Sequence, residues 1–313
     1  MMHKQNILVV RNPKAGQGSR LYDDTLDLLR RSIRRLEVIE TQKPGDAEEI
    51  ARKAAESRGW DALAVAGGDG TLNEAANGLI GSDLPMGIIP VGTANVLAKE
   101  ISMPNDAKGV SQILQKGSDL KIHPGIINGR VFLLMVGAGF DGIVASGISE
   151  KLKSIVGPGA YVFAALKEVF SNATPMVEVE TDGMKYSATW AVVSNISLYG
   201  GFYRMAPSAN LETPGFIVTL FNSASPFSKV RDLLAVAVNR NGAPWGAKII
   251  RASNARLSGG LLQVDGDSYG SSTAELEVSS KSMNLIIPKI LVKEKVRFKS
   301  PVECSQVTSS VQG

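Results

Sequence analysis

In the first 125 residues, short apolar runs alternate with segments in which apolar residues recur every three or four positions. The short runs predict buried strands, and the recurring positions predict amphipathic helices. The predicted strands are residues 6–10, 37–41, 61–66 and 86–90, and the predicted helices are residues 21–36, 45–57, 73–80 and 93–100. Strands that alternate with helices in this way predict an α/β fold, a doubly wound parallel sheet with helices on both faces.

Beyond residue 125, apolar runs typical of strands dominate the chain. The predicted strands are residues 130–140, 176–195, 216–221, 247–253, 261–267, 274–279 and 283–288, interrupted by helices near 159–171 and 228–239. The Asp-Gly pair of "TDGM" (181–184) favours a tight hairpin, because both residues accept the positive φ of primed turns. These patterns predict a β-rich, antiparallel and sandwich-like C-terminal domain.

We therefore divide the chain into an α/β domain at 1–125 and a β-rich domain at 126–287. Residues of about 288–300 could return to the first domain. The polar residues 301–313 are expected to form a flexible tail.

Composition excludes few classes of protein. The 313 residues are 44% hydrophobic and 20% charged, as in ordinary globular proteins. The net charge of +4 suits contact with an anionic membrane leaflet better than nucleic-acid binding, although a basic protein in solution explains it equally well. The single Cys304 allows no internal disulfide. No apolar run reaches the length of a membrane span or a signal peptide, so we expect a cytoplasmic protein.

Three glycine-rich segments each follow a predicted strand: "NPKAGQGS" (12–19), "GGDGTLN" (67–73) and "PVGTAN" (90–95). The carboxyl ends of parallel strands meet at one edge of a sheet, so these loops should lie together. Bare backbone N–H groups beside helix N-termini bind phosphates well, and Thr71 and Thr93 could cap a helix or reach a phosphate oxygen. Any one loop could be merely a tight turn, but three in register favour a phosphate site.

Asp69 lies among these glycines. A carboxylate beside a phosphate is repulsive unless a cation lies between them, and Mg²⁺ binds through one or two carboxylates plus substrate phosphates. Asp69 is therefore predicted to hold the magnesium of a magnesium nucleotide; the alternative is an ordinary turn aspartate.

An ordered set of motifs resembles the diacylglycerol kinase catalytic-domain family, which includes soluble bacterial diacylglycerol kinases, sphingosine kinases and ceramide kinases. The motifs are "NPKAG" (12–16), "GDA" (45–47) after Thr41, "GGDGTLNE" (67–74), "PVGTAN" (90–95), "GAGFDGIV" (137–144), "GGFYRMAPSANL" (200–211) and "VDGD" (264–267). The "GGDG" motif alone is shared with NAD kinases and phosphofructokinases, whereas the ordered set is specific and covers roughly residues 5–290. The resemblance implies an NAD kinase/diacylglycerol kinase-like fold with ATP between a nucleotide-binding domain and a lipid or acceptor domain.

The resemblance also implies roles for individual residues. The implied nucleotide contacts are Asn12, Pro13, Lys14, Ala15, Gly16, Thr41, Gly67, Gly68, Asp69, Gly70, Thr71, Leu72, Asn73 and Thr93. Asp267 would be the general base for the attacking lipid hydroxyl, with Asp69 as a second catalytic residue and metal ligand. Phosphoryl transfer to an alcohol requires such a base or orienting group. Without the resemblance, Asp265 and Asp267 would be part of a hairpin turn that Asp265 shapes.

Three positions depart from the family pattern. Val96 and Pro214 stand where many members have aspartates that assist magnesium, and Asp267 stands where the base is commonly glutamate. We expect no ordered magnesium near residues 211–216 unless Glu212 rebuilds that site. The departures indicate either a distinct subfamily with its own acceptor or an impaired kinase.

The sequence thus predicts an ATP- and Mg²⁺-dependent lipid kinase that contacts the membrane transiently and binds no nucleic acid. The acceptor would be of the diacylglycerol, sphingoid base or ceramide class. Exposed strand edges would allow a homodimer. The alternatives are an NAD kinase-like kinase of a soluble acceptor and a nucleotide- or lipid-sensing protein.

Overall fold

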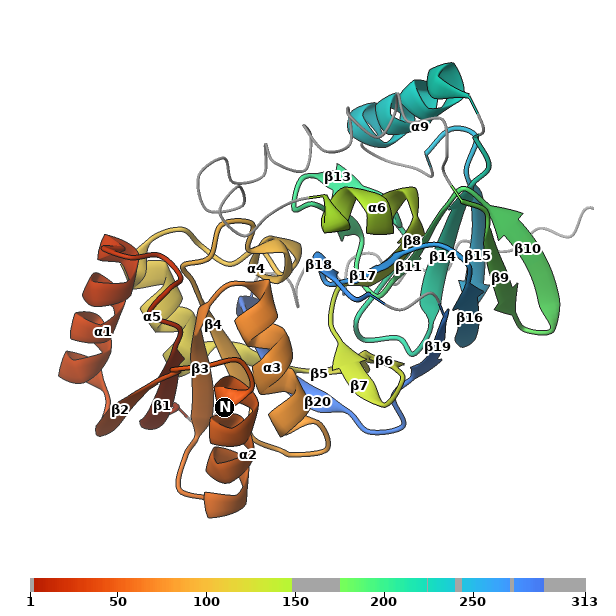
Figure 1. Ribbon diagram of the computed structural model, residues 1–313. Helices are drawn as coiled ribbons and strands as arrows, with labels where there is room; N and C mark the ends of the chain where they lie inside the picture. Colours follow the sequence, from red (N-terminus) through yellow and green to blue (C-terminus); the bar gives the residue numbers. More distant parts are fainter. Residues whose placement is uncertain (1–2, 148–174, 224, 240–243, 271–272, 290–313) are drawn as a thin grey trace, which may run out of the picture.

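The computed structural model describes residues 3–147, 175–223, 225–239, 244–270 and 273–289 (Figure 1). The chain forms a first domain around one six-stranded sheet and a second domain around two further six-stranded sheets. The predicted fold class, an α/β domain followed by an antiparallel β-rich domain, is confirmed. The predicted helix at 159–171 and the tail at 301–313 lie outside the described residues.

The first sheet has the strand order β2-β1-β3-β4-β20-β5. All of its strands are parallel except β5, which runs antiparallel beside β20. The central strands are buried along their whole length, as expected for a sheet covered on both faces. The strands are β1 (Asn6–Arg11), β2 (Arg35–Glu40), β3 (Ala62–Gly67), β4 (Met86–Pro90), β5 (Ser118–Ile122) and β20 (Met283–Ile287).

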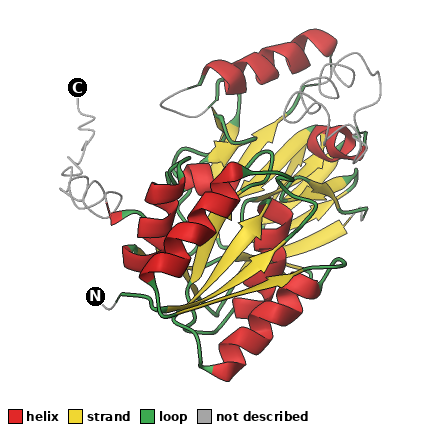
Figure 2. Cartoon of the chain, turned by 90° about the vertical axis from the view of Figure 1, so that its left-hand side faces the viewer, coloured by secondary structure: helices red, strands yellow, loops and turns green. Residues whose placement is uncertain are grey.

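Helices cover this sheet on both faces (Figure 2). Helix α1 packs with α5, and α2 packs with α3. The helices are α1 (Arg20–Ser32), α2 (Asp46–Ser57), α3 (Asp69–Leu79), α4 (Val96–Glu100) and α5 (Ala107–Lys116). Helix α5 was not predicted, although Asp106 caps it by accepting a 2.8 Å hydrogen bond from the Gly109 N–H.

Three helices differ from their predicted bounds by three residues or more. Helix α4 begins at Val96 rather than at 93. Helix α1 ends at Ser32 rather than near 36, because the N–H groups of Arg34 and Arg35 both donate to the Gln5 carbonyl and lead the chain into β2. Helix α3 begins at Asp69 rather than at 73, so the "DGT" of the glycine motif is already helical.

Strand β20 comes from the far end of the chain and completes the first sheet between β4 and β5. The sequence analysis assigned residues 283–287 to the second domain and expected the chain to return to the first domain only at about 288–300. Antiparallel pairing with β5 over its whole length places β20 in the first sheet.

The second domain is a sandwich of two sheets, with orders β10-β9-β16-β19-β6-β7 and β15-β14-β11-β8-β17-β18. Side chains from both sheets of the sandwich share one core. Phe132 and Val179 come from the sheet that begins with β10, and Val193 and Phe216 come from the sheet that begins with β15. The first of these sheets contains β6 (Gly125–Ile127), β7 (Arg130–Phe132), β9 (Val177–Thr181), β10 (Met184–Ala188), β16 (Asn254–Ser258) and β19 (Thr273–Val278). The second contains β8 (Met135–Gly139), β11 (Trp190–Ser194), β14 (Phe216–Phe221), β15 (Lys248–Ala252), β17 (Leu262–Val264) and β18 (Asp267–Ser268).

Smaller elements flank the sandwich. They are α6 (Phe140–Ser146), α9 (Pro226–Val238) and a hairpin of β12 (Leu198–Tyr199) and β13 (Tyr203–Arg204). Within the described ranges, no helix is both long and apolar enough to cross a membrane.

Two Asp-Gly pairs form two-residue hairpin turns. Asp182 and Gly183 join β9 to β10 with φ of 47° and 77°. Asp265 and Gly266 join β17 to β18 with φ of 50° and 91°. Positive φ at both positions is the feature that primed turns require, so the predicted "TDGM" hairpin is confirmed.

The predicted strand at 130–140 is two strands, β7 and β8, in different sheets of the sandwich. At the break, the N–H groups of Leu133, Leu134 and Met135 donate to the Asp265 carboxylate at 2.8, 2.8 and 3.0 Å. A side chain remote in sequence therefore satisfies the backbone where the chain changes sheet.

Candidate active site

The three glycine loops meet at one edge of the first sheet, as predicted. A Cβ atom added to Gly92 would lie 2.4 Å from the Gly68 Cα, which brings the third and fourth strand loops into direct contact. A Cβ atom added to Gly16 would lie 2.6 Å from the Val91 carbonyl oxygen, and Gly16 has a φ of 58°. At these contacts a larger residue would push the loops apart.

Asn12 ties the first loop to helix α3. Its side-chain amide donates to the Thr71 hydroxyl at 3.1 Å, and its backbone N–H donates to the Ala66 carbonyl at 2.9 Å. Its side-chain oxygen accepts the N–H of Lys14 at 3.0 Å. Asn12 and the buried Thr71 therefore shape the loop, while the Lys14 side chain is exposed above it.

The remaining predicted residues of this edge occupy the same loops. Thr41 follows β2 and donates its N–H to the Arg11 carbonyl at 2.8 Å, so it lies beside the end of β1. Pro13 and Ala15 are half-buried in the first loop, and Thr93 is exposed in the fourth-strand loop.

Asp69 is the first residue of α3, and its carboxylate caps a second helix. Its two oxygens accept the N–H groups of Val96 and Leu97, the first residues of α4, at 3.0 and 3.1 Å. Burial raises the pKa of Asp69, while these two N–H groups and nearby Lys99 act to lower it. The anion at the start of α4 is thus Asp69 itself, and a carboxylate has more acceptor sites than these two N–H groups use.

Two residues expected to contact a nucleotide have other partners. The Leu72 side chain is buried in the core of the first domain, and its N–H is bonded to the Gly68 carbonyl. The Asn73 amide donates to the Val131 carbonyl at 2.9 Å and to the Asp265 carboxylate at 2.8 Å. Leu72 and Asn73 therefore fix α3 to the core and to the second domain.

Asp267 lies in β18 next to the start of α3. A Cβ atom added to Gly70 would lie 3.5 Å from the Asp267 Oδ2. Asp267 is exposed, whereas Asp265 of the same turn accepts four N–H hydrogen bonds, as the hairpin interpretation anticipated for a turn-shaping residue. Burial raises the pKa of Asp265 to about 6, although its N–H donors act to lower it.

Helix α4 connects the glycine loops to the second domain. The Glu100 carboxylate accepts the N–H groups of Ser197 and Leu198 at 3.2 and 3.1 Å and the Ser197 hydroxyl at 2.9 Å. The Lys99 ammonium lies 3.8 Å from the centre of the Phe202 ring. Burial lowers the pKa of Lys99, and Asp69 raises it. Sequence reasoning missed both residues, since no motif marks them.

A buried carboxylate, Asp141, connects the "GAGFDG" and "VDGD" motifs. It accepts hydrogen bonds from the Tyr199 hydroxyl and from the Gln263 amide, the latter at 2.7 Å. Gln263 in turn accepts the Gly266 N–H at 2.7 Å. Burial raises the pKa of Asp141. The sequence analysis used this motif only for the family resemblance and assigned Asp141 no role. A Cβ atom added to Gly137 would lie only 1.6 Å from the Asp141 Oδ2, so the glycine of the motif leaves space for the Asp141 carboxylate.

The segment at 211–216 offers few oxygen ligands. The Leu211 carbonyl accepts the His123 N–H at 3.0 Å, and Pro214 is exposed. The absence of an ordered magnesium there remains a prediction. Over the whole described part of the chain, no three His, Cys, Asp or Glu side chains gather into a group that could hold a metal by themselves. A hollow of about 570 Å³ lies on the sandwich sheet that contains β6, β9, β16 and β19, and none of the candidate residues line it.

Comparison with known families assigns both domains. Residues 6–126 match the diacylglycerol kinase catalytic domain, and residues 134–287 match the YegS C-terminal NAD kinase beta sandwich-like domain. A diacylglycerol kinase of Staphylococcus aureus (strain bovine RF122 / ET3-1) is 28% identical over 301 residues, which cover 92% of this chain and 94% of the relative. A diacylglycerol kinase of Staphylococcus epidermidis (strain ATCC 35984) gives the same values.

Solved structures from Bacillus anthracis str. Sterne share the fold. One of them superposes with a TM-score of 0.76 and 20% identity, covering 93% of this chain and 99% of the other. A second, described as a diacylglycerol kinase, has a TM-score of 0.71 and 19% identity over the same shares. At this identity the likeness shows the fold alone.

Proposed function

Because the chain belongs to the diacylglycerol kinase catalytic-domain family, we propose that it is an ATP-dependent lipid kinase that phosphorylates a hydroxyl of a membrane-derived lipid. One observation carries this proposal. The carboxylate of Asp267, from the second domain, lies beside Gly70 in the first turn of α3. A candidate base is thereby placed against the loops best suited to phosphates.

The nucleotide phosphates would bind where the glycine loops meet. The first N–H groups of α3 lack partners within the helix and carry its partial positive charge. Close packing of Gly68 on Gly92 leaves backbone rather than side chains at this surface. The exposed Lys14 would add a positive charge from the first loop.

The same edge fits Mg²⁺ held by one carboxylate together with phosphate oxygens. Asp69 is fixed by the N–H groups of Val96 and Leu97, and its remaining lone pairs are the hard oxygen donors that Mg²⁺ prefers. When bound, Mg²⁺ would neutralise phosphate charge next to Asp69. The buried Val96 adds no second carboxylate.

Asp267 would accept the proton of the lipid hydroxyl while the hydroxyl oxygen forms a bond to the γ-phosphorus of ATP. The bond from that phosphorus to the oxygen bridging the β- and γ-phosphates breaks, and ADP leaves with its electron pair. Aspartate is one methylene shorter than glutamate, so its position must be exact to within about 1 Å. The two-residue turn locked by Asp265 provides that rigidity.

Lipid phosphorylation tests the proposal directly. The full-length protein is incubated with γ-labelled ATP, Mg²⁺ and a total bacterial lipid extract, and the labelled product is identified by mass. We expect label in the organic phase, on a lipid with a free hydroxyl. Label only on a water-soluble product would assign the chain to kinases of soluble acceptors. ATP binding without transfer to any acceptor would identify a sensing protein.

A further inference from the structure

Helix α9 carries an apolar stripe that is exposed in the described part of the structure. Phe227, Leu234 and Val238 are 85%, 56% and 55% exposed, and their spacing of seven and four residues places them along one side of the helix. Trp245, 75% exposed, follows in the next segment. Single exposed apolar residues are ordinary, but several along one side of a helix are typical of an interaction site.

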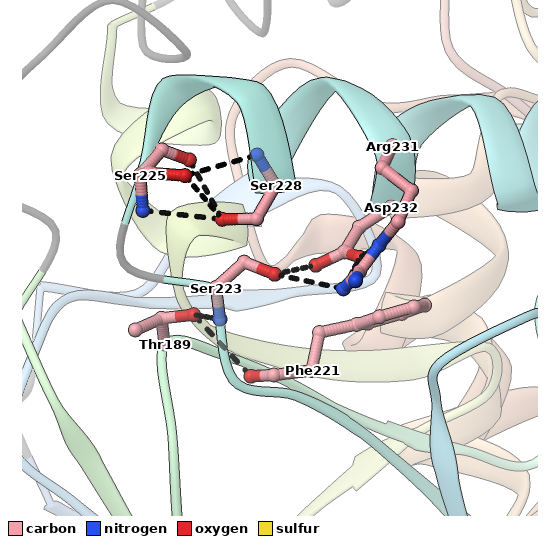
Figure 3. A network of polar contacts seen from close by, with 7 residues as sticks. All are labelled: Thr189, Phe221, Ser223, Ser225, Ser228, Arg231 and Asp232. Atoms are coloured by element: carbon pink, nitrogen blue, oxygen red, sulfur yellow. Dashed lines mark hydrogen bonds and ion pairs between the residues drawn. The ribbon is translucent and has the colours of Figure 1, made fainter.

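The helix that carries the stripe is firmly held (Figure 3). Ser225 and Ser228 form a capping box at its start. Asp232 is 1% exposed and binds the Arg231 guanidinium at 2.7 Å and the Ser223 hydroxyl. Because its inner face is already packed in this way, α9 presents the apolar stripe outward as a rigid surface.

Two described segments near α9 carry exposed cations. On α9 itself, the partly exposed Arg231 guanidinium is ion-paired with the buried Asp232 carboxylate at 2.7 Å, so this pair adds no net charge. Beyond the helix, Lys248 and Arg204 are exposed, and Asn239 at the end of α9 donates to the Arg204 carbonyl at 3.0 Å. An apolar stripe with a cationic rim fits the interface of an anionic bilayer. A second copy would instead bring two cationic rims together.

The surface leads toward the candidate active site. Helix α9 contacts β13, whose hairpin carries Phe202 with 62% exposure. The Phe202 ring lies over Lys99 of α4, the helix that Asp69 caps. In Figure 1, α9, β13 and α4 follow one another from the top of the molecule toward its middle. A lipid hydroxyl at the bilayer interface would thus meet the protein near the glycine loops.

We propose that α9, Phe202 and Trp245 form a surface that binds anionic bilayers. The role of this surface in reaching the lipid substrate rests on the proposed kinase function. Its binding to vesicles does not, because vesicle binding requires no phosphate transfer.

Vesicle flotation without ATP tests the proposal with the full-length protein. The vesicles are phosphatidylcholine with about 30% phosphatidylglycerol, an anionic surface of the kind basic segments bind. The double substitution Phe227→Gln and Leu234→Gln keeps residues of good helix propensity and should lower vesicle partitioning about tenfold or more. The matched control, Ile39→Gln with Met184→Gln, removes side chains of 41% and 59% exposure on β2 and β10 and should leave partitioning unchanged.

Trp245 fluorescence supplies an independent readout, because Trp190 is buried and Trp60 is covered by Arg35. We expect a blue shift with these vesicles that Trp245→Phe abolishes. Equal partitioning of the double variant and the control would overturn the proposal. So would a change in oligomeric state alone, which would assign the stripe to a second copy. A chain that binds vesicles through this surface yet phosphorylates no lipid would contradict the proposed kinase function and leave the docking surface in place.

Discussion

The side-chain amide of Asn73 donates a 2.8 Å hydrogen bond to the Asp265 carboxylate, joining the helix of the glycine motif to the turn that carries Asp267. The same carboxylate accepts three consecutive backbone N–H groups between β7 and β8. The Asp265 side chain therefore links the helix of the glycine motif directly to the turn that precedes the candidate base.

Removing this carboxylate should be costly. Asp265→Ala leaves four N–H donors without their acceptor, and a buried donor left unsatisfied costs about 1–3 kcal/mol. Because some donors will recruit water, we expect the free energy of unfolding in urea to fall by about 3–5 kcal/mol. Asp182→Ala is the matched control: it lies in an Asp-Gly turn of the same geometry but is exposed, so a loss below about 1 kcal/mol is expected. Equal losses in the two variants would contradict the role of Asp265.

Asp265 should also make stability depend on pH. Its pKa in the folded chain is raised to about 6 from 3.8, so the folded state holds a proton that the unfolded state has already released. The stabilising contribution is complete below about pH 4 and is lost as pH rises through about 6, by roughly 3 kcal/mol in all. The difference in unfolding free energy between wild type and Asp265→Asn should therefore fall between about pH 4 and 7. A difference that is flat with pH would show that the pKa is not raised.

Much of this architecture could be predicted from local patterns. Buried strands followed by glycines, and two Asp-Gly pairs between strands, specify turns and sheet edges within a few residues. The sandwich switch at residues 133–135 could not be predicted, because one continuous apolar run spans it and the carboxylate that stabilises the break is about 130 residues away. The return of β20 to the first sheet likewise depends on pairing with β5, for which the chain has no local signal. Within the site, the partners of Asn73 and Asp69 became visible only in three dimensions.

Gly92→Ala should separate the two glycine loops. The added methyl group would lie 2.4 Å from the Gly68 Cα, so the fourth-strand loop must move. A shift of about 1 Å in groups that position phosphates costs on the order of 100-fold in activity. We expect weaker ATP binding by calorimetry with the fold retained in circular dichroism. Gly59→Ala, whose nearest new contact is 3.9 Å away, is the control and should bind ATP like the wild type.

Asp69→Ala should abolish Mg²⁺-dependent ATP use. Because Asp69 also caps α4, the substitution should in addition lower the free energy of unfolding by about 1–2 kcal/mol without preventing folding. Asp106→Ala separates the two effects, because Asp106 caps α5 with a similar hydrogen bond but lies apart from the glycine loops in sequence. Loss of ATP use in Asp69→Ala alone would support the metal role. Near-normal ATP use by Asp69→Ala would show that this loop does not bind Mg-ATP.

Asp267→Asn tests the general base most directly. Asparagine is nearly isosteric with aspartate, so the turn should survive while proton acceptance is lost. Turnover should fall by about 10²–10⁴ with ATP affinity almost unchanged, the usual contribution of a positioned base. Asp267→Glu is the informative companion, since its carboxylate would project one methylene further toward Gly70, where Asp267 Oδ2 is already within 3.5 Å of an added Cβ. If the rigid Asp265-Gly266 turn is matched to the shorter side chain, the glutamate variant should also be impaired. Activity of the glutamate variant at or above that of wild type would show that the turn does not compensate for the shorter base. Unchanged turnover in Asp267→Asn, measured with labelled ATP and a lipid acceptor, would remove Asp267 from the chemistry.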